Sequence, residues 1–292
     1  MRKVTKDYAQ TPSSLNSCTK NIQNALTEKG SHKFSNSIYA SDTVKKSLNE
    51  IYKNKCAYCE TDTTAGSVLQ VEHYRPKAKV TEDSKHEGYY WLGYEWSNLM
   101  YSCSSCNRAK STSFPIDLQN GGKRIYNPPM TGLDLDKTKY SANDNDLMNE
   151  KPLLLNPEEQ NFNPETHLII GPNGEIKGRT TRGNSTIQIC KLDRKNLILA
   201  RKKIVDIHLR NLMAAFYKYS LNEITKNELI VRIKVVIETI IQIIIENQPY
   251  TLLAKFMLKY FEFFFIKRFQ TNEQLILKDV FQSYKSILTN IV

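Results

Sequence analysis

Four cysteines occur as two Cys-x2-Cys pairs, Cys56 with Cys59 and Cys103 with Cys106. Two thiolates separated by two residues can reach one ion from a single tight turn, and two such turns complete a tetrahedral zinc site. Two disulfides, or four unrelated thiols, are the alternative. The strict pairing favours zinc, and so does an N-terminus, MRKVTKDYAQTPSS, that lacks the apolar segment of a secretory signal. We therefore expect a structural zinc ion in a cytoplasmic protein.

A second set of polar side chains lies between the cysteine pairs and just after them. Glu72 and His73 follow the β-prone run 67–71, and Asn98 and Asn107 come later. Neighbours on a strand face opposite sides, so one of the first two can hold a metal while the other faces a water, if the strand twists or ends there. Carboxylate and amide oxygens are hard ligands that suit Mg²⁺ or Mn²⁺ and do not suit a thiolate zinc site. Two metals are therefore implied, a structural Zn²⁺ and a separate catalytic Mg²⁺ or Mn²⁺.

The order of these residues resembles the HNH (ββα-metal) nuclease family in its zinc-bound form. The match comprises Cys-x2-Cys, an acidic-His pair followed by Pro, an Asn-Leu pair, and Cys-x2-Cys-Asn-x2-Lys. The resemblance implies that His73 is the general base and that Glu72 and Asn107 hold the catalytic metal. It also implies that Asn98 braces the loop and orients the base. The last metal position is His in many members and Asn here, a variant that still suits Mg²⁺.

A further resemblance covers roughly residues 50–210 and is to the HNH nucleases of Septu-type and retron-associated anti-phage systems. The stretches that carry it are Gly88–Pro115, Lys151–Pro157, His167–Ile187 and Lys191–Arg194. In those systems the nuclease is encoded beside an ABC-like ATPase. The resemblance implies a defence effector that acts with such a partner, which composition and spacing alone do not show.

The net charge of +11 favours a polyanionic partner, although a solvated lysine-rich surface would give the same composition. Arg75, Lys77, Arg108 and Lys110 lie near the motif and are the candidate nucleic-acid contacts. DNA is the favoured substrate and RNA the alternative, because the motif acts on a phosphodiester and reads no base. No apolar run approaches the ~18 residues of a membrane span, so no membrane partner is expected.

The local patterns, together with the HNH resemblance, imply an α+β fold. It comprises an N-terminal helical arm at 1–54, a zinc-bound ββα-metal HNH core at 55–117, a loop-rich segment with a β-hairpin at 118–184, and a C-terminal helical region at 185–292. A strand at 67–73 carries the base, and a helix that starts near Ser104 carries Asn107. Asn173-Gly174 predicts the hairpin turn. Other helices are expected at about 13–28 and 42–53, from 186 onward, and at 223–247, 250–268 and 272–291.

Several stretches allow two interpretations. The aromatic residues at 89–96 can stack on bases, but the core of so small a unit is the favoured role. The apolar stretch at 229–245 favours a helical core, with a partner surface as the alternative. His86 and residues 116–150 are expected in solvated loops, and Cys18 and Cys190 as small core residues. For the whole chain, the alternative to a nuclease is a non-catalytic zinc module that binds nucleic acid or bridges a complex.

Overall fold

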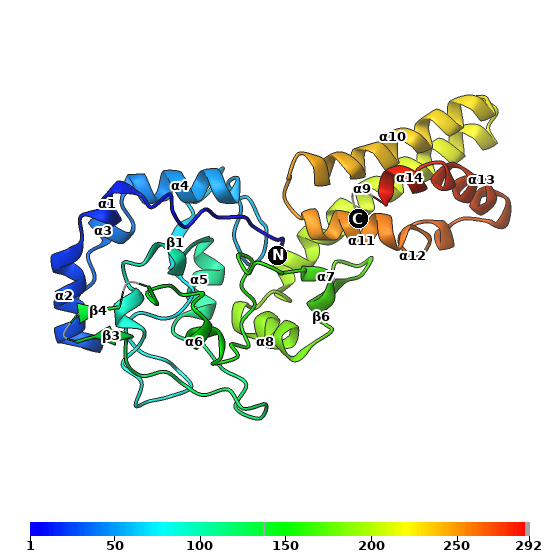
Figure 1. Ribbon diagram of the computed structural model, residues 1–292. Helices are drawn as coiled ribbons and strands as arrows, with labels where there is room; N and C mark the ends of the chain where they lie inside the picture. Colours follow the sequence, from blue (N-terminus) through cyan, green and yellow to red (C-terminus); the bar gives the residue numbers. More distant parts are fainter. Residues whose placement is uncertain (133, 137, 290–292) are drawn as a thin grey trace. The chain divides into compact units, whose positions relative to one another are not determined.

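A computed structural model describes residues 1–132, 134–136 and 138–289 (Figure 1). The chain divides into two compact units. The larger unit comprises Arg2–His167 and Gly178–Leu192, and the smaller comprises Met1, Leu168–Lys177 and the chain from Asp193. The segment predicted at 118–184 is therefore shared between the units. Among the described residues, no helix is both long and apolar enough to span a membrane.

The larger unit begins with short helices. They are α1 (Ser13–Asn16), α2 (Thr19–Glu28), α3 (Asn36–Tyr39) and α4 (Asp42–Tyr52). The helix predicted at 13–28 is thus two helices. Helix α4 begins at Asp42, as predicted, and Ser41 is its N-cap, because the Ser41 side chain accepts a hydrogen bond from the Val44 amide at 3.3 Å.

Two antiparallel strands and a helix form the centre of the larger unit. Strand β1 (Gln70–His73) pairs with β2 (Leu99–Ser102), and His73 lies opposite Leu99. Helix α5 (Ser104–Lys110) follows β2 after a single residue and packs against β1. The predicted strand begins three residues later than expected, whereas the predicted start of the helix at Ser104 is confirmed.

The core around this centre is aromatic. Tyr89, Tyr90, Trp91, Tyr94 and Trp96 are each at most 3% exposed, so the core interpretation of this run is confirmed. All four residues of β2 are buried as well. Cys18 and Cys190 are buried small residues, as expected.

The remaining elements of the larger unit are β3 (Met130–Thr131), β4 (Asp134–Leu135), α6 (Asn145–Met148), α7 (Pro164–His167) and α8 (Thr181–Cys190), which packs on α5. The expectation of a purely surface loop at 116–150 is wrong. Ala142, Leu147 and Glu150 are buried, and Glu150 pairs with a buried arginine. His86, expected in solvent, is also buried, and its Nε2 lies 2.9 Å from the Ile125 carbonyl oxygen.

The smaller unit starts with the predicted hairpin, formed by β5 (Leu168–Ile170) and β6 (Ile176–Gly178). Gly174 in its turn has φ +82°, a conformation that favours glycine. Helices α9 (Lys195–Ser220), α10 (Lys226–Ile245), α11 (Thr251–Lys259), α12 (Phe261–Phe264), α13 (Thr271–Gln282) and α14 (Lys285–Leu288) follow. Helix α10 contacts α9, α11 and α13 (Figure 1). One face of α10 is therefore core, as favoured from the sequence.

Candidate functional site

The two cysteine pairs come together as one buried cluster. All four Sγ atoms lie within 4.8 Å of one another, and those of Cys59 and Cys103 are 3.8 Å apart. Tetrahedral zinc with Zn–S bonds of about 2.3 Å places its sulfurs roughly 3.8 Å apart. All six cysteines lie in the described part of the chain and none of them forms a disulfide, which excludes the disulfide alternative in this structure. The cluster fits a zinc ion.

Local backbone structure sets the position of each pair. The first pair lies in a tight turn, closed by a hydrogen bond from the Glu60 amide to the Cys56 carbonyl oxygen at 3.0 Å. The Ala57 amide donates to the carbonyl oxygen of Tyr101 at 2.8 Å and so attaches this turn to β2. In the second pair, Cys103 is the N-cap of α5 and its Sγ accepts from the Cys106 amide at 3.5 Å. The cluster therefore connects β2 and the start of α5 to the first turn.

Electrostatics within the cluster also favour a cation. Burial raises the pKa of the Cys56 thiol well above its ordinary value. Hydrogen bonds from the other cysteines hold the pKa of Cys59 well below the ordinary value. Several thiolates cannot share a buried site without a compensating positive charge.

His73 is the last residue of β1 and its imidazole is buried. Its Nε2 lies 2.9 Å from the Gly93 carbonyl oxygen, and a carbonyl can only accept. The Nε2 atom therefore carries the proton, and Nδ1 is the nitrogen with a lone pair that can accept one. Burial, followed by the nearby Lys77 ammonium, holds the pKa of His73 well below its ordinary value. The imidazole is thus neutral at neutral pH, the form a general base requires.

Lys77 donates a hydrogen bond to Nδ1 of His73. Its Nζ is 3.3 Å from His73 Nδ1 and 4.7 Å from the centre of the Tyr39 ring. The same Tyr39 ring contacts the His73 imidazole at a centroid distance of 4.7 Å. An aromatic residue of α3 thus packs on both the candidate base and its neighbouring cation.

Glu72 is buried and ion-paired. Its Oε1 lies 2.6 Å from Lys110 Nζ, which also donates to the His73 carbonyl oxygen at 2.8 Å. Burial raises the pKa of Glu72, and Lys110 opposes that shift. Lys110 is fully buried, so the structure differs from the expectation that it contacts nucleic acid. Its two acceptors explain why: the ammonium connects α5 to the end of β1.

Arg75 also differs from the expected phosphate contact. The side chain is fully buried and forms an ion pair with Glu150. Its guanidinium donates further to the carbonyl oxygens of Ala142 at 3.3 Å and Leu147 at 2.6 Å. These bonds make Arg75 a structural residue. Of the four basic candidates, Arg108 is exposed and Lys77 is half-buried, so these two stay candidates for nucleic-acid contact.

Asn98 is fully buried, and its side chain forms hydrogen bonds with the backbone just after His73. Its Oδ1 accepts from the Arg75 amide at 2.8 Å, and its Nδ2 donates to the carbonyl oxygens of Arg75 and Leu92 at 3.0 and 3.1 Å. Leu92 precedes Gly93, the acceptor for His73. Asn98 therefore braces both segments that orient the imidazole, and it is a positioning residue.

Asn107 lies on the face of α5 that meets β1. Its Nδ2 donates to Oε1 of Gln70 at 2.9 Å. Both residues line a cavity of about 960 Å³ whose wall also includes Tyr39. Gln70 was not among the predicted site residues. Its position two residues before Glu72 could have indicated it, because this spacing places both side chains on one face of the strand.

Glu72 and Asn107 offer a donor set that fits a hard divalent cation. The carboxylate and the amide come from β1 and α5, which contact each other. Such ions in nuclease-type sites take one or two protein oxygens and fill the other positions with water and phosphate oxygens. Among the described residues, the four cysteines form the only group of three or more His, Cys, Asp or Glu side chains close enough to hold a metal. A second metal would therefore depend on this pair.

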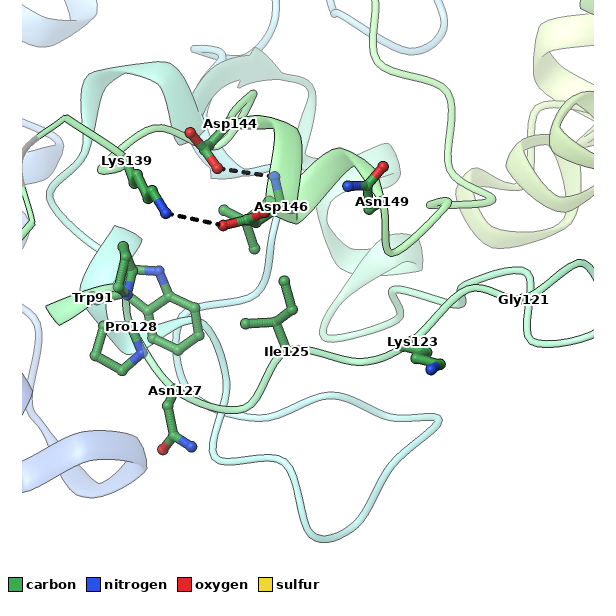
Figure 2. Close-up of a pocket in the computed structure, with 12 residues that line it drawn as sticks. Trp91, Gly121, Lys123, Ile125, Asn127, Pro128, Lys139, Asp144, Asp146 and Asn149 are labelled. Atoms are coloured by element: carbon green, nitrogen blue, oxygen red, sulfur yellow. Dashed lines mark hydrogen bonds and ion pairs between the residues drawn. The ribbon is translucent and has the colours of Figure 1, made fainter.

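Another cavity, of about 520 Å³, lies away from these residues (Figure 2). Its lining includes Trp91, Ile125 and Leu147, and the ion pair of Lys139 with Asp146 at 3.7 Å lies in its wall. It contains none of the sequence-predicted site residues. The chemistry described above therefore belongs to the β1–α5 region.

The chain is similar to Septu proteins. It is 32% identical over 186 residues to Septu protein PtuB of Bacillus mycoides (strain KBAB4), an alignment that covers 61% of this chain and 56% of the relative. It is 26% identical over 165 residues to Septu protein PtuA of the same strain, covering 55% of this chain and 20% of the relative. It is 27% identical over 179 residues to Septu protein PtuB of Bacillus thuringiensis, covering 53% of this chain and 65% of the relative. The chain thus matches less than two thirds of the length of each relative. No family model and no solved structure matches it.

Proposed function

We propose that this protein is a metal-dependent endonuclease of the HNH (ββα-metal) type that hydrolyses phosphodiester bonds of nucleic acid, with DNA the favoured substrate. One observation carries the proposal. A neutral, oriented histidine, His73, ends a strand beside Glu72 and next to a helix that bears Asn107. The strands, the helix and the four-cysteine cluster occur in the order that the HNH resemblance implies.

In this mechanism His73 Nδ1 accepts a proton from the attacking water, because Nε2 already carries one. Lys77 must release its contact with Nδ1 so that the water can bind there. The Lys77 ammonium is then available to the scissile phosphate. Asn98 holds the imidazole in line through the backbone of Arg75 and Leu92. Glu72 and Asn107 would hold a Mg²⁺ or Mn²⁺ ion, which would supply positive charge for the scissile phosphate and the leaving oxygen.

The similarity to Septu proteins supports a role in anti-phage defence. We propose that the protein is a cytoplasmic effector that acts with an ABC-like ATPase subunit. The net charge of +11 suits the proposed nucleic-acid substrate. The competing proposal is a non-catalytic zinc module that binds nucleic acid or bridges a complex. It accounts for the cysteines and the charge but gives no role to a neutral, braced His73.

The test is cleavage of plasmid DNA and of total cellular RNA by purified protein with Mg²⁺ or Mn²⁺, beside His73→Ala. We expect cleavage that the variant loses while its zinc content and circular dichroism stay unchanged. Cutting by both proteins would remove His73 as the base. Silence of both proteins moves the assay to the complex with the co-expressed ATPase, and silence there favours the non-catalytic module.

A further inference from the structure

We infer that Gln70 is a positioning residue for the divalent ion, which it serves by fixing the direction of the Asn107 amide. The inference rests on the proposed function, because it concerns the same metal. It assigns a role to a residue that lies outside the HNH motif and carries no charge.

The first step is the geometry of the amide. Asn107 Nδ2 donates to Gln70 Oε1 at 2.9 Å. An amide group is planar with its nitrogen and oxygen on opposite sides, so holding Nδ2 against β1 fixes the direction of Oδ1. No hydrogen bond within the described residues uses Asn107 Oδ1. That oxygen is the atom a Mg²⁺ or Mn²⁺ ion would bind.

A parallel contact holds the other candidate ligand. Lys110 Nζ lies 2.6 Å from Oε1 of Glu72, which leaves Oε2 as the oxygen for the ion. Gln70 and Glu72 are two residues apart on β1, and Asn107 and Lys110 are three apart on α5. Each pair therefore lies on one face of its element. Two polar contacts cross the β1–α5 interface side by side, and each leaves one oxygen of a candidate ligand unused.

The two contacts differ in what their loss would do to the fold. Lys110 is fully buried, so its substitution would disturb the core. Gln70 is exposed, and it lines the 960 Å³ cavity together with Asn107. Its side chain can be changed while its backbone stays paired with Ser102 in the sheet. Gln70 thus allows the positioning role to be tested without loss of structure.

The experiment measures Mn²⁺ binding by zinc-loaded, full-length protein, using the electron paramagnetic resonance signal of free Mn²⁺. Gln70→Met removes the acceptor at nearly constant volume and charge. Second-shell substitutions commonly weaken metal binding by about 10–100-fold, and we expect a loss in that range. Gln70→Glu keeps an acceptor and should keep the affinity. Gln23→Met changes an exposed glutamine on α2 and should match the parent protein.

Asn107→Ala and Glu72→Gln identify the ligands in the same titration. If Gln70→Met binds Mn²⁺ like the parent while Asn107→Ala loses affinity, the positioning role is wrong and the proposed site stands. Weak binding by Gln70→Glu as well would contradict the acceptor role. If the parent itself binds no Mn²⁺, the metal site of the proposed function fails, and this inference fails with it.

Discussion

The basic residues that follow His73 show how burial separates side chains of the same charge. Arg75 and Lys77 are two residues apart, and nothing in their neighbourhood along the chain distinguishes the two. In the structure Arg75 is fully buried against Glu150, whereas Lys77 is half-buried beside the candidate base. A buried charge must be paired, so Arg75 belongs to the fold and Lys77 to the site.

We predict that Arg75→Met destabilises the protein by about 3–5 kcal/mol, because it leaves the buried carboxylate of Glu150 without its ion-pair partner. Lys77→Met is the matched control, with the same new side chain two residues away, and should change stability by less than about 1 kcal/mol. Urea unfolding followed by circular dichroism measures both. Equal stability of Arg75→Met and the parent would show that Arg75 is dispensable to the fold.

Helix α5 depends on the cysteine cluster at its first turn. Cys103 is both a member of the cluster and the N-cap of the helix that carries Asn107 and Lys110. We predict that Cys103→Ser loses bound zinc, lowers the melting temperature and abolishes cleavage, since a metal ligand and the alignment of α5 are lost together. Metal analysis and thermal unfolding measure the effects.

Cys18→Ala is the control for that prediction. Cys18 is buried outside the cluster, so the variant should keep its full zinc content. A Cys103→Ser protein that cleaves fully without zinc would contradict the structural role of the metal.

Helix α9 contains a buried histidine whose protonation opposes folding. Burial lowers the pKa of His208 from 6.5 to about 4, and its Nδ1 has no partner among the described residues. Because the unfolded chain binds the proton first, stability is complete above pH 6.5 and falls as the pH drops towards 4. We predict a loss on the order of 3 kcal/mol across this window.

His208→Leu should remove this part of the pH dependence. Denaturant unfolding of the parent and the variant at pH 7.5, 5.5 and 4.5 gives the difference directly, because all other groups titrate equally in both proteins. Parallel stability curves for the two proteins would show that folding does not change the pKa of His208.

Local signals predicted individual elements better than their junctions. The start of α5 at Ser104 and the hairpin at Asn173-Gly174 followed from residues close in the chain. The helix expected from 186 onward is instead α8 and α9, because Lys191 adopts a left-handed conformation between them with φ 47°. Apolar periodicity continues across such a break and so cannot locate it.

The site was predictable to the extent that its residues are close in sequence. The cysteine pairs and the order of Glu72, His73, Asn98 and Asn107 could be recognised because they form a sequence motif. The pairing of Arg75 with Glu150 joins residues 75 positions apart, and no spacing rule indicates it. The hydrogen bond between Gln70 and Asn107 likewise depends on how β1 meets α5.

At the scale of the whole molecule, the smaller unit presents apolar surface on the two helices α9 and α10. Met213 and Tyr217 on α9 and Leu221 just after its end follow one another at intervals of four residues and are exposed, as are Val231 and Val235 on α10. The opposite face of α10 is buried core. A short turn joins the two helices, which contact each other, so the exposed residues near the turn lie on neighbouring helices.

A patch of exposed apolar side chains on neighbouring helices is the kind of surface that contacts another protein. We therefore predict that Val231→Glu combined with Val235→Glu weakens binding to the proposed ATPase partner at least tenfold. Two carboxylates would be desolvated in that interface without partners. The free protein should keep its stability, because both positions are more than half exposed.

Leu275→Glu is the control for this surface, since Leu275 is 58% exposed on α13 of the same unit and carries the same substitution. Pull-down of the co-expressed partner with each variant, followed by titration of the purified proteins, measures the effect. Loss of binding in the valine variant alone would place the partner on α10. Undiminished binding of the valine variant would exclude this face and direct the search for the partner's contact to other surfaces of the protein.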